Sequence, residues 1–161
     1  DGCLDSGGAW FGKLGCLRKL PKIDRLVIDK SERRLSAYRG TELVRDMEVS
    51  LGRDPVGNKF QEGDNRTPEG VYPVVAHQER SRYHRSLRLG YPTASQREHA
   101  REQGIDPGGD IMIHGIRNGL GWIGDAHLLM DWTRGCIAVT NGEIEWLFET
   151  VPDGTPVEIR S

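Results

Sequence analysis

Three segments in the first third of the chain have strand-like patterns of apolar residues: the first is a short apolar, β-branched run, and the other two alternate with a period of two. The segments are Arg25–Asp29, Arg34–Tyr38 and Leu43–Leu51, and turn-like residues at 30–32 and 39–41 separate them. Alternation at this period is typical of β-strands with one buried face, and short turns between consecutive strands favour antiparallel pairing. The pattern therefore predicts an antiparallel meander.

Four shorter apolar runs follow, at Val71–Ala76, Asp110–His114, Cys136–Val139 and Thr155–Ile159. Short apolar runs bounded by turn residues predict strands. Pro73 has no N–H to donate to a neighbouring strand, so we expect Val71–Ala76 to be an edge strand or an interrupted one.

Two helices are predicted from their capping residues. Thr140 and Glu143 have the spacing of a capping box, and apolar residues follow at helical spacing. Another helix is expected after Tyr91-Pro92 and before Gly104, a residue type that commonly ends helices. Its candidate N-caps are Thr93 and Ser95, with Gln96 or Glu98 as the reciprocal partner.

Composition agrees with a turn-rich β protein, because the 161 residues include 21 glycines and 8 prolines. Residues 1–22 are rich in glycine and weakly periodic, which predicts an irregular N-terminal arm. No repeat or linker divides the remainder, so residues 23–161 are predicted to form one mainly β domain.

Charge and hydropathy exclude two classes of protein. The 22 Lys and Arg residues nearly balance 24 Asp and Glu residues, giving a formal charge of −2, whereas nucleic-acid binders usually carry a basic surface. No apolar run approaches the roughly 18 residues needed to span a bilayer. The first 22 residues do not resemble a signal peptide, but a processed chain would lack one, so the compartment stays open.

Three cysteines are present, and the third lies far from the others. Cys3 and Cys16 either form a disulfide, which would indicate an oxidising compartment, or remain two thiols in the arm. Cys136 is then left as a free thiol, which in an extracytoplasmic protein is a candidate reactive group.

Cys136 follows Thr133-Arg134-Gly135, and this context favours nucleophilic chemistry. A glycine directly before the thiol allows a sharp turn and close approach of a carbonyl, and backbone N–H groups at such a turn can stabilise an oxyanion. The positive charge of Arg134 lies next to the thiol in sequence. The alternative is a buried structural cysteine, a frequent fate for free thiols.

A cysteine nucleophile needs a base, and histidine commonly supplies it. His114 leaves an apolar strand and precedes Gly115, which places it at a plausible active-site position. His127 is an alternative base or a residue that orients the loop and substrate. A zinc site formed by His114, His127 and Cys136 is a further alternative, although no pair of them has the short spacing typical of zinc motifs.

IMIHG at 111–115 and DWTRGCIAVT at 131–140, with Cys136 22 residues after His114, resemble the catalytic domain of YkuD-type L,D-transpeptidases. That family carries a His-Gly element followed by a Ser/Thr-x-Gly-Cys element. The resemblance spans about residues 24–160. LVIDKSERRLSAYRG, DNRTPEGVYPV and VPDGTPVEI support it in the same order.

The resemblance implies a mainly β, sandwich or barrel-like fold with a Cys-His site under a loop-lined groove. It further implies a periplasmic or otherwise extracytoplasmic enzyme that acts on peptidoglycan stem peptides without a metal or cofactor. Cys136 would attack the carbonyl that joins diaminopimelate to the terminal D-alanine, and His114 would be the base. Gly135, Thr133, Arg134, His127 and Gly115 are the expected oxyanion or substrate-binding residues.

Two positions depart from the pattern of many relatives, which have histidine at the place of Arg134 and arginine or asparagine at that of Ala138. These differences bear on substrate choice. The sequence also resembles a branch that includes an enzyme hydrolysing the bond between murein and its attached lipoprotein. Transfer is therefore the leading hypothesis, and hydrolysis by a carboxypeptidase or amidase on the same site is the alternative. A non-catalytic wall-binding module is a remote one.

Overall fold

The computed structural model describes residues 9–10, 16–17, 20–120, 126–128 and 130–161. In the N-terminal arm, β1 (Ala9–Trp10) pairs with β2 (Cys16–Leu17) in antiparallel orientation. The predicted alternatives for Cys3 and Cys16 lie outside the described residues and side chains.

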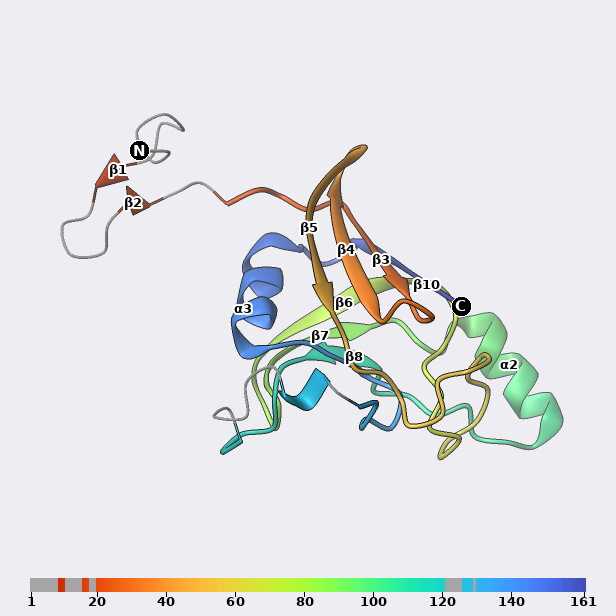
Figure 1. The fold of residues 1–161 in the computed structure, drawn as a ribbon. Helices are drawn as coiled ribbons and strands as arrows, with labels where there is room; N and C mark the ends of the chain where they lie inside the picture. Colours follow the sequence, from red (N-terminus) through yellow and green to blue (C-terminus); the bar gives the residue numbers. More distant parts are fainter. Residues whose placement is uncertain (1–8, 11–15, 18–19, 121–125, 129) are drawn as a thin grey trace.

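One eight-stranded sheet forms the body of the protein, with strand order β5-β4-β3-β10-β6-β7-β8-β9. β10 is parallel to β3 and β8 is parallel to β9, while the other neighbours are antiparallel. Figure 1 shows β3–β5 standing across β6–β8. The strands are β3 (Arg25–Asp29), β4 (Arg34–Arg39), β5 (Glu42–Glu48), β6 (Gly70–Ser81), β7 (His84–Leu89), β8 (Met112–His114), β9 (Ile137–Ala138) and β10 (Pro156–Arg160).

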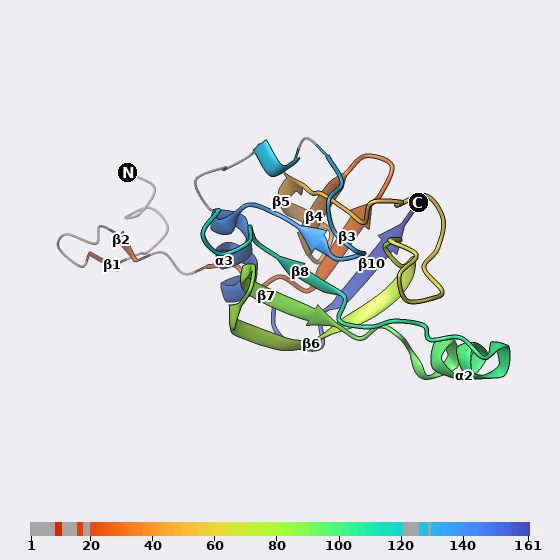
Figure 2. The ribbon, with the colours of Figure 1, turned by 90° about the horizontal axis from the view of Figure 1, so that it is seen from below.

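The two edges of this sheet meet, so the sheet closes into a barrel-like shape. Just beyond β5, Ser50 exchanges two backbone hydrogen bonds of 2.9 Å with Ala138 of β9, and Gly52 forms a bridge to Thr133. The view in Figure 2 looks onto this side of the molecule, with β8 and β9 in front of β3 and β10. The predicted mainly β, barrel-like fold with two helices is confirmed.

A single hydrophobic core fills the space between the two halves of the sheet and under the second helix. α3 (Asn141–Thr150) contributes Ile144 and Leu147, both with no exposed surface. Leu26, Leu35 and Ile137 come from three different strands and are equally buried. Burial of apolar area is the main stabilising contribution to such a fold, at about 25 cal/mol per Å².

Both predicted capping boxes are present. The Thr140 hydroxyl accepts from the Glu143 N–H, and the Glu143 carboxylate accepts from the Thr140 N–H. α2 (Ala94–Gln103) begins after Thr93, with Gln96 as the reciprocal partner, and ends at Gly104. α2 and α3 lie at opposite ends of the molecule (Figure 1). Neither helix is long and apolar enough to cross a bilayer.

The predicted strand positions are confirmed for the meander. At the centre of the sheet, the edge position offered for Val71–Ala76 was wrong, although the register with β7 shifts between Val74 and Ala76, and one strand was not predicted. β6, which contains Pro73, is a central strand between β10 and β7. Pro73 is tolerated there because its backbone polar groups face Gly90, just past the end of β7, where its carbonyl accepts from the Gly90 N–H at 2.9 Å and the ladder needs no N–H from residue 73. β7 was not predicted, since Arg85 and Arg88 interrupt its apolar pattern.

Candidate active site

Cys136 lies at the seam where the barrel closes. It immediately precedes β9, and the chain before it is bonded to the chain after β5. Thr133 N–H donates to the Leu51 carbonyl at 3.1 Å, and the Thr133 carbonyl accepts from Arg53 N–H at 3.0 Å. The segment that carries the thiol is thus held at fixed backbone positions rather than on an independent loop.

The side chain of Thr133 organises the turn into Cys136. Its hydroxyl donates to the Cys136 carbonyl at 2.7 Å and accepts from the Gly135 N–H at 3.1 Å. Thr133 is 5% exposed, so both bonds are shielded from water. In this geometry Thr133 fixes the backbone at Cys136, and the Gly135 N–H, expected to face an oxyanion, is engaged within the turn.

Gly135 is required by both conformation and space. Its φ is +142°, and a Cβ at this position would lie 2.7 Å from the Arg66 carbonyl oxygen. Such a distance is shorter than real carbon–oxygen contacts, and the positive φ disfavours L side chains. The chain can therefore pass between Arg66 and the pocket only with a glycine before the cysteine.

An ion pair also holds the segment that precedes Cys136. The Asp131 carboxylate accepts from the guanidinium of Arg33, at 2.8 Å for Nη2, and from the Leu51 N–H at 3.0 Å. Arg33 lies between β3 and β4, so this pair connects the first hairpin to the segment that leads to Cys136. The connection is set by topology, since 98 residues separate the two partners.

His114 ends β8 and is 2% exposed. Its ring stacks on Tyr83 with 4.3 Å between centroids and 26° between planes, and Trp132 lies against it at 5.7 Å and 60°. The Nδ1 atom is 2.7 Å from the Gly115 carbonyl oxygen. Because a carbonyl can only accept, Nδ1 carries the proton and the neutral ring presents Nε2 as an unprotonated acceptor.

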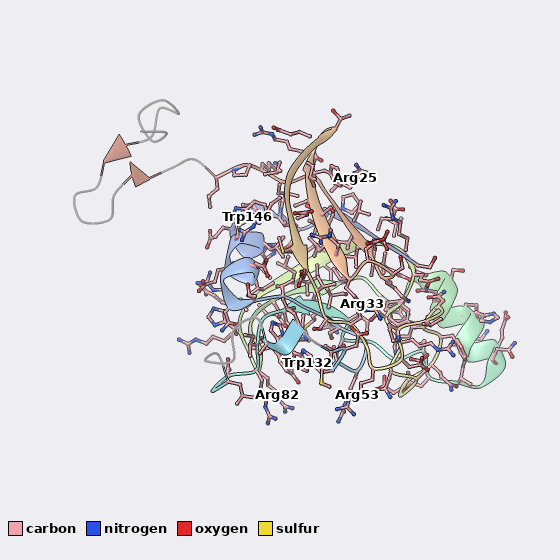
Figure 3. All side chains as sticks on the ribbon, in the orientation of Figure 1. Arg25, Arg33, Arg53, Arg82, Trp132 and Trp146 are labelled. Atoms are coloured by element: carbon pink, nitrogen blue, oxygen red, sulfur yellow. The ribbon has the colours of Figure 1, made fainter. Side chains whose placement is uncertain are left out.

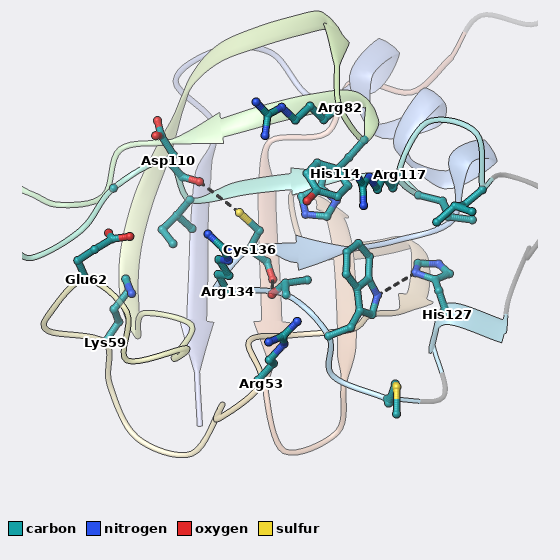
Figure 4. A pocket seen from close by; sticks show the side chains of 18 of the residues that line it. Arg53, Lys59, Glu62, Arg82, Asp110, His114, Arg117, His127, Arg134 and Cys136 are labelled. Carbon is teal, nitrogen blue, oxygen red and sulfur yellow. Dashed lines mark hydrogen bonds between the residues drawn. The ribbon is translucent and has the colours of Figure 1, made fainter.

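The parallel pairing of β8 with β9 brings Cys136 and His114 to one side of the sheet. His114 is opposite Ala138, so Cys136 stands two residues earlier on the neighbouring strand and points to the same side. With ordinary strand spacings, their Cα atoms are separated by about 8 Å. Both side chains line one pocket with a volume of about 840 Å³ (Figure 4).

Burial determines the charge states of both groups. It lowers the pKa of His114 to about 4, opposed by the bond to Gly115, and nearby His127 lowers it further. Burial raises the pKa of the Cys136 thiol to about 11, although the Met112 N–H and Lys59 favour the thiolate. At neutral pH the unliganded site therefore holds a thiol and a neutral imidazole.

The resting thiol does not donate to the histidine. Its Sγ lies 3.2 Å from the backbone carbonyl oxygen of Asp110, which accepts the S–H bond (Figure 4). Asp110 has a φ of +52°, and its carboxylate pairs with Arg88 at 2.8 Å. A rotation about the cysteine Cα–Cβ bond is needed to move the sulfur from this carbonyl.

The remaining predicted residues also lie around the pocket or behind it. His127 lines the pocket, its Nδ1 accepts from the Trp132 indole N–H at 3.3 Å, and its carbonyl accepts from Ser50. Arg134 is exposed at the rim. Gly115 lies behind His114, where a Cβ would come within 2.4 Å of the Asn141 amide oxygen. His127 thus contacts Trp132, which in turn contacts His114.

Among the described residues, His, Cys, Asp and Glu side chains form no group of three or more that could hold a metal ion. The zinc alternative with His114, His127 and Cys136 therefore has no preformed ligand set in that part of the chain. His127 uses Nδ1 toward Trp132, and His114 uses Nδ1 toward Gly115.

Sequence reasoning did not identify Tyr83, Trp132 or Asp110 as site residues. Tyr83 is in the turn between β6 and β7, and only the pairing of β7 with β8 brings it onto His114. Trp132 is part of the DWTRGC segment, so its position four residues before Cys136 was the one available signal. Nothing local marks the Asp110 carbonyl as a partner of the thiol.

Known proteins match this chain along most of its length. The YkuD family, described as an L,D-transpeptidase catalytic domain, matches residues 23–159. YafK of Escherichia coli (strain K12), a candidate L,D-transpeptidase, is 30% identical over 130 residues, which are 77% of this chain and 45% of YafK.

Solved structures share the fold. The helical cell shape determining protein Pgp2 of Campylobacter jejuni superposes with a TM-score of 0.65 at 24% identity, covering 88% of this chain and 48% of Pgp2. An L,D-transpeptidase from Mycobacterium smegmatis gives a TM-score of 0.59 at 14% identity, covering 91% and 62%. The chain thus spans about half the length of YafK and of Pgp2.

Proposed function

Because the chain belongs to the YkuD family of L,D-transpeptidase catalytic domains, we propose that it transfers acyl groups of peptidoglycan stem peptides through Cys136. The observation that carries this proposal is the placement of a free thiol and a neutral histidine on adjacent strands of one pocket. A substrate peptide would enter this pocket from outside the cytoplasm, where the wall is built.

His114 is the base in this proposal. Its Nδ1–H is fixed on the Gly115 carbonyl, so Nε2 is the atom that accepts the thiol proton. Burial disfavours both the free thiolate and the free imidazolium, so the proton moves to Nε2 as the sulfur attacks rather than beforehand. Tyr83 and Trp132 are positioning residues, since they hold the ring plane and exclude water from it.

The first half-reaction begins when the sulfur leaves the Asp110 carbonyl and bonds to the substrate carbonyl carbon. For a tetrapeptide stem this carbon belongs to the L-centre of diaminopimelate, and the leaving group is the amine of D-alanine. The C–N bond breaks as Nε2–H delivers its proton to that amine. A thioester on Cys136 remains, with His114 neutral again.

The second half-reaction needs an acceptor with a removable proton. A diaminopimelate side-chain amine gives a cross-link between stems, a protein lysine gives an attachment to the wall, and water gives a shortened stem. In each case His114 Nε2 takes the acceptor proton as the acceptor bonds to the carbonyl carbon, the thioester C–S bond breaks, and Nε2–H returns the proton to the departing Cys136 sulfur. Transfer is the proposal, and hydrolysis differs from it only in the acceptor.

The thioester is the intermediate that tests this proposal. Protein mixed with a tetrapeptide stem and quenched in acid after milliseconds to seconds should show a mass increase equal to the tripeptide acyl group. Digestion should place that mass on Cys136 rather than on Cys3 or Cys16. Substrate turnover without any acylated Cys136 under these conditions would contradict the proposal.

A further inference from the structure

Four arginines surround the pocket, and they come from four separate segments. Arg53 follows β5, Arg82 is in the turn between β6 and β7, Arg117 follows β8 and Arg134 precedes Cys136. Figure 4 shows Arg82 and Arg117 on the side of His114, with Arg53 and Arg134 on the other side of Cys136. In Figure 3, Arg53 and Arg82 project from the same end of the molecule as Trp132.

None of these four side chains forms an ion pair with a described residue, whereas two neighbouring arginines do. Arg33 pairs with Asp131 and Arg88 pairs with Asp110, at 2.8 Å in each case. The four guanidinium groups at the pocket are exposed, so their donors remain available to a ligand.

The other charges of the pocket do not cancel them. Lys59 is neutralised by Asp64 at 2.8 Å, and Asp110 is engaged by Arg88. Glu62 is then the one remaining carboxylate among the described residues of the lining, against four guanidinium groups. Like charges gathered around one pocket raise the local concentration of ligands of opposite sign.

Guanidinium groups bind carboxylates through paired N–H donors, and the bond is stronger than a neutral hydrogen bond. We propose that Arg53, Arg82, Arg117 and Arg134 form a carboxylate-binding rim that selects stem peptides with free rather than amidated acid groups. This inference rests on the proposed function for the identity of the peptide. Such a stem carries carboxylates on its glutamate and on the second centre of its diaminopimelate, in addition to its terminal alanine.

The two pairs of arginines in the rim would bind different parts of the peptide. Arg82 and Arg117 lie beyond His114, and Arg53 and Arg134 lie beyond Cys136, so a peptide across the thiol meets one pair on each side of the reacting carbonyl (Figure 4). Amidation replaces a charged acceptor by a neutral group of nearly the same size. Its effect on affinity therefore reports charge recognition and not shape.

The test compares two synthetic tetrapeptide stems, one with free acids and one with carboxamides on glutamate and diaminopimelate. Calorimetric titration uses the Cys136→Ala protein, so that no chemistry occurs, at low and at moderate salt. We expect the free acid to bind about tenfold more tightly, with the preference shrinking as salt screens the exposed charges.

The matched variants remove the rim in two halves, as Arg82→Gln with Arg117→Gln and as Arg53→Gln with Arg134→Gln. Each pair should reduce affinity for the free acid several-fold and should reduce affinity for the carboxamide, which keeps only its terminal carboxylate, clearly less. Arg97→Gln is the control, because Arg97 is an exposed arginine on α2, outside this pocket. It should preserve the full preference.

Equal binding of both peptides, or an equal loss on both in the rim variants, would overturn the carboxylate-binding rim. A different result would contradict the proposed function without contradicting the rim. If the free acid binds preferentially to Cys136→Ala but the active protein turns over neither peptide, the rim stands and acyl transfer on this substrate does not.

Discussion

The Cys136 thiol donates a hydrogen bond to the Asp110 backbone carbonyl, at an Sγ–O distance of 3.2 Å. The thiol and His114 share the pocket without sharing a proton at rest. Burial raises the pKa of the thiol and lowers that of the imidazole, so each neutral form is favoured. At rest the site therefore holds a neutral thiol and a neutral imidazole, and in the proposed function this pair ionises during attack.

The first prediction concerns the pH dependence of thiol alkylation. Because the pKa of Cys136 is raised to about 11, the thiolate fraction grows tenfold for each pH unit through the neutral range. The rate of Cys136 modification by iodoacetamide should thus rise continuously from pH 7 to pH 10. Peptide-level mass spectrometry separates Cys136 from Cys3 and Cys16. A plateau reached below pH 8 would reveal a preformed thiolate.

The second prediction concerns Tyr83, which stacks on His114 at 4.3 Å. Removing the ring in Tyr83→Ala admits water to His114, so the lowered pKa should move back toward its ordinary value of about 6.5. The acid limb of the kcat/KM profile should shift upward accordingly, with a loss of up to about fourfold at pH 6 and about tenfold at pH 5.5. Tyr83→Phe keeps the stacked ring and should keep the profile of the unaltered protein. An unchanged acid limb in Tyr83→Ala would contradict the positioning role.

The third prediction concerns folding stability between pH 7 and pH 4.5. The pKa of His114 is lowered to about 4 in the folded state, so the unfolded chain binds more protons in this window and stability falls as pH falls. His114→Gln removes this effect while other groups titrate as before. The difference in unfolding free energy between the two proteins should therefore change by about 2–3 kcal/mol across the window. Urea titrations at both pH values measure it, and parallel pH dependence of the two proteins would be the contrary result.

The fourth prediction separates two glycines of the same region. Gly135→Ala places a Cβ 2.7 Å from the Arg66 carbonyl at a φ of +142°, so it should cost about 2 kcal/mol of stability and displace Cys136. A Cβ added at Gly142 in α3 would have no neighbour within 4 Å, so Gly142→Ala should leave stability unchanged or raise it by up to about 1 kcal/mol. Thermal unfolding and kcat measure both variants. Equal behaviour of the two would show that space at Gly135 is not limiting.

Local signals in the sequence were sufficient for the helices and for most strands. Thr93, Gln96, Thr140 and Glu143 cap helices with side chains that act within one turn, so their spacing alone is informative. The central position of β6 was not predictable, because Pro73 is accommodated only where the ladder with β7 ends, at Gly90. The pairing of β6 with β7 sets that position, and β7 itself was not predicted.

The candidate site also has residues that short sequence motifs predict and residues that only the fold brings together. The Gly135-Cys136 and His114-Gly115 pairs are short motifs, and the structure places both around one pocket. The residues around these motifs come from distant parts of the sequence. The pairing of β7 with β8 places Tyr83 against His114, and Arg33 binds Asp131 across the seam of the barrel. The four arginines of the carboxylate-binding rim have no common spacing in the sequence, and only the fold brings them together around the pocket. The rim was therefore not predicted from the sequence.

Acyl transfer through Cys136 is tested most directly by analysis of reaction products by mass spectrometry. Purified protein and its Cys136→Ala variant are incubated with disaccharide-tetrapeptide muropeptides, with and without a competing amine, and with murein that carries attached lipoprotein peptides. We expect a cross-linked or amine-exchanged tripeptide product that depends on Cys136. Shortened stems or released peptides alone, again absent from the variant, would replace transfer by hydrolysis at the same thiol. The same products from Cys136→Ala, or no product from either protein, would contradict cysteine-dependent chemistry at this site.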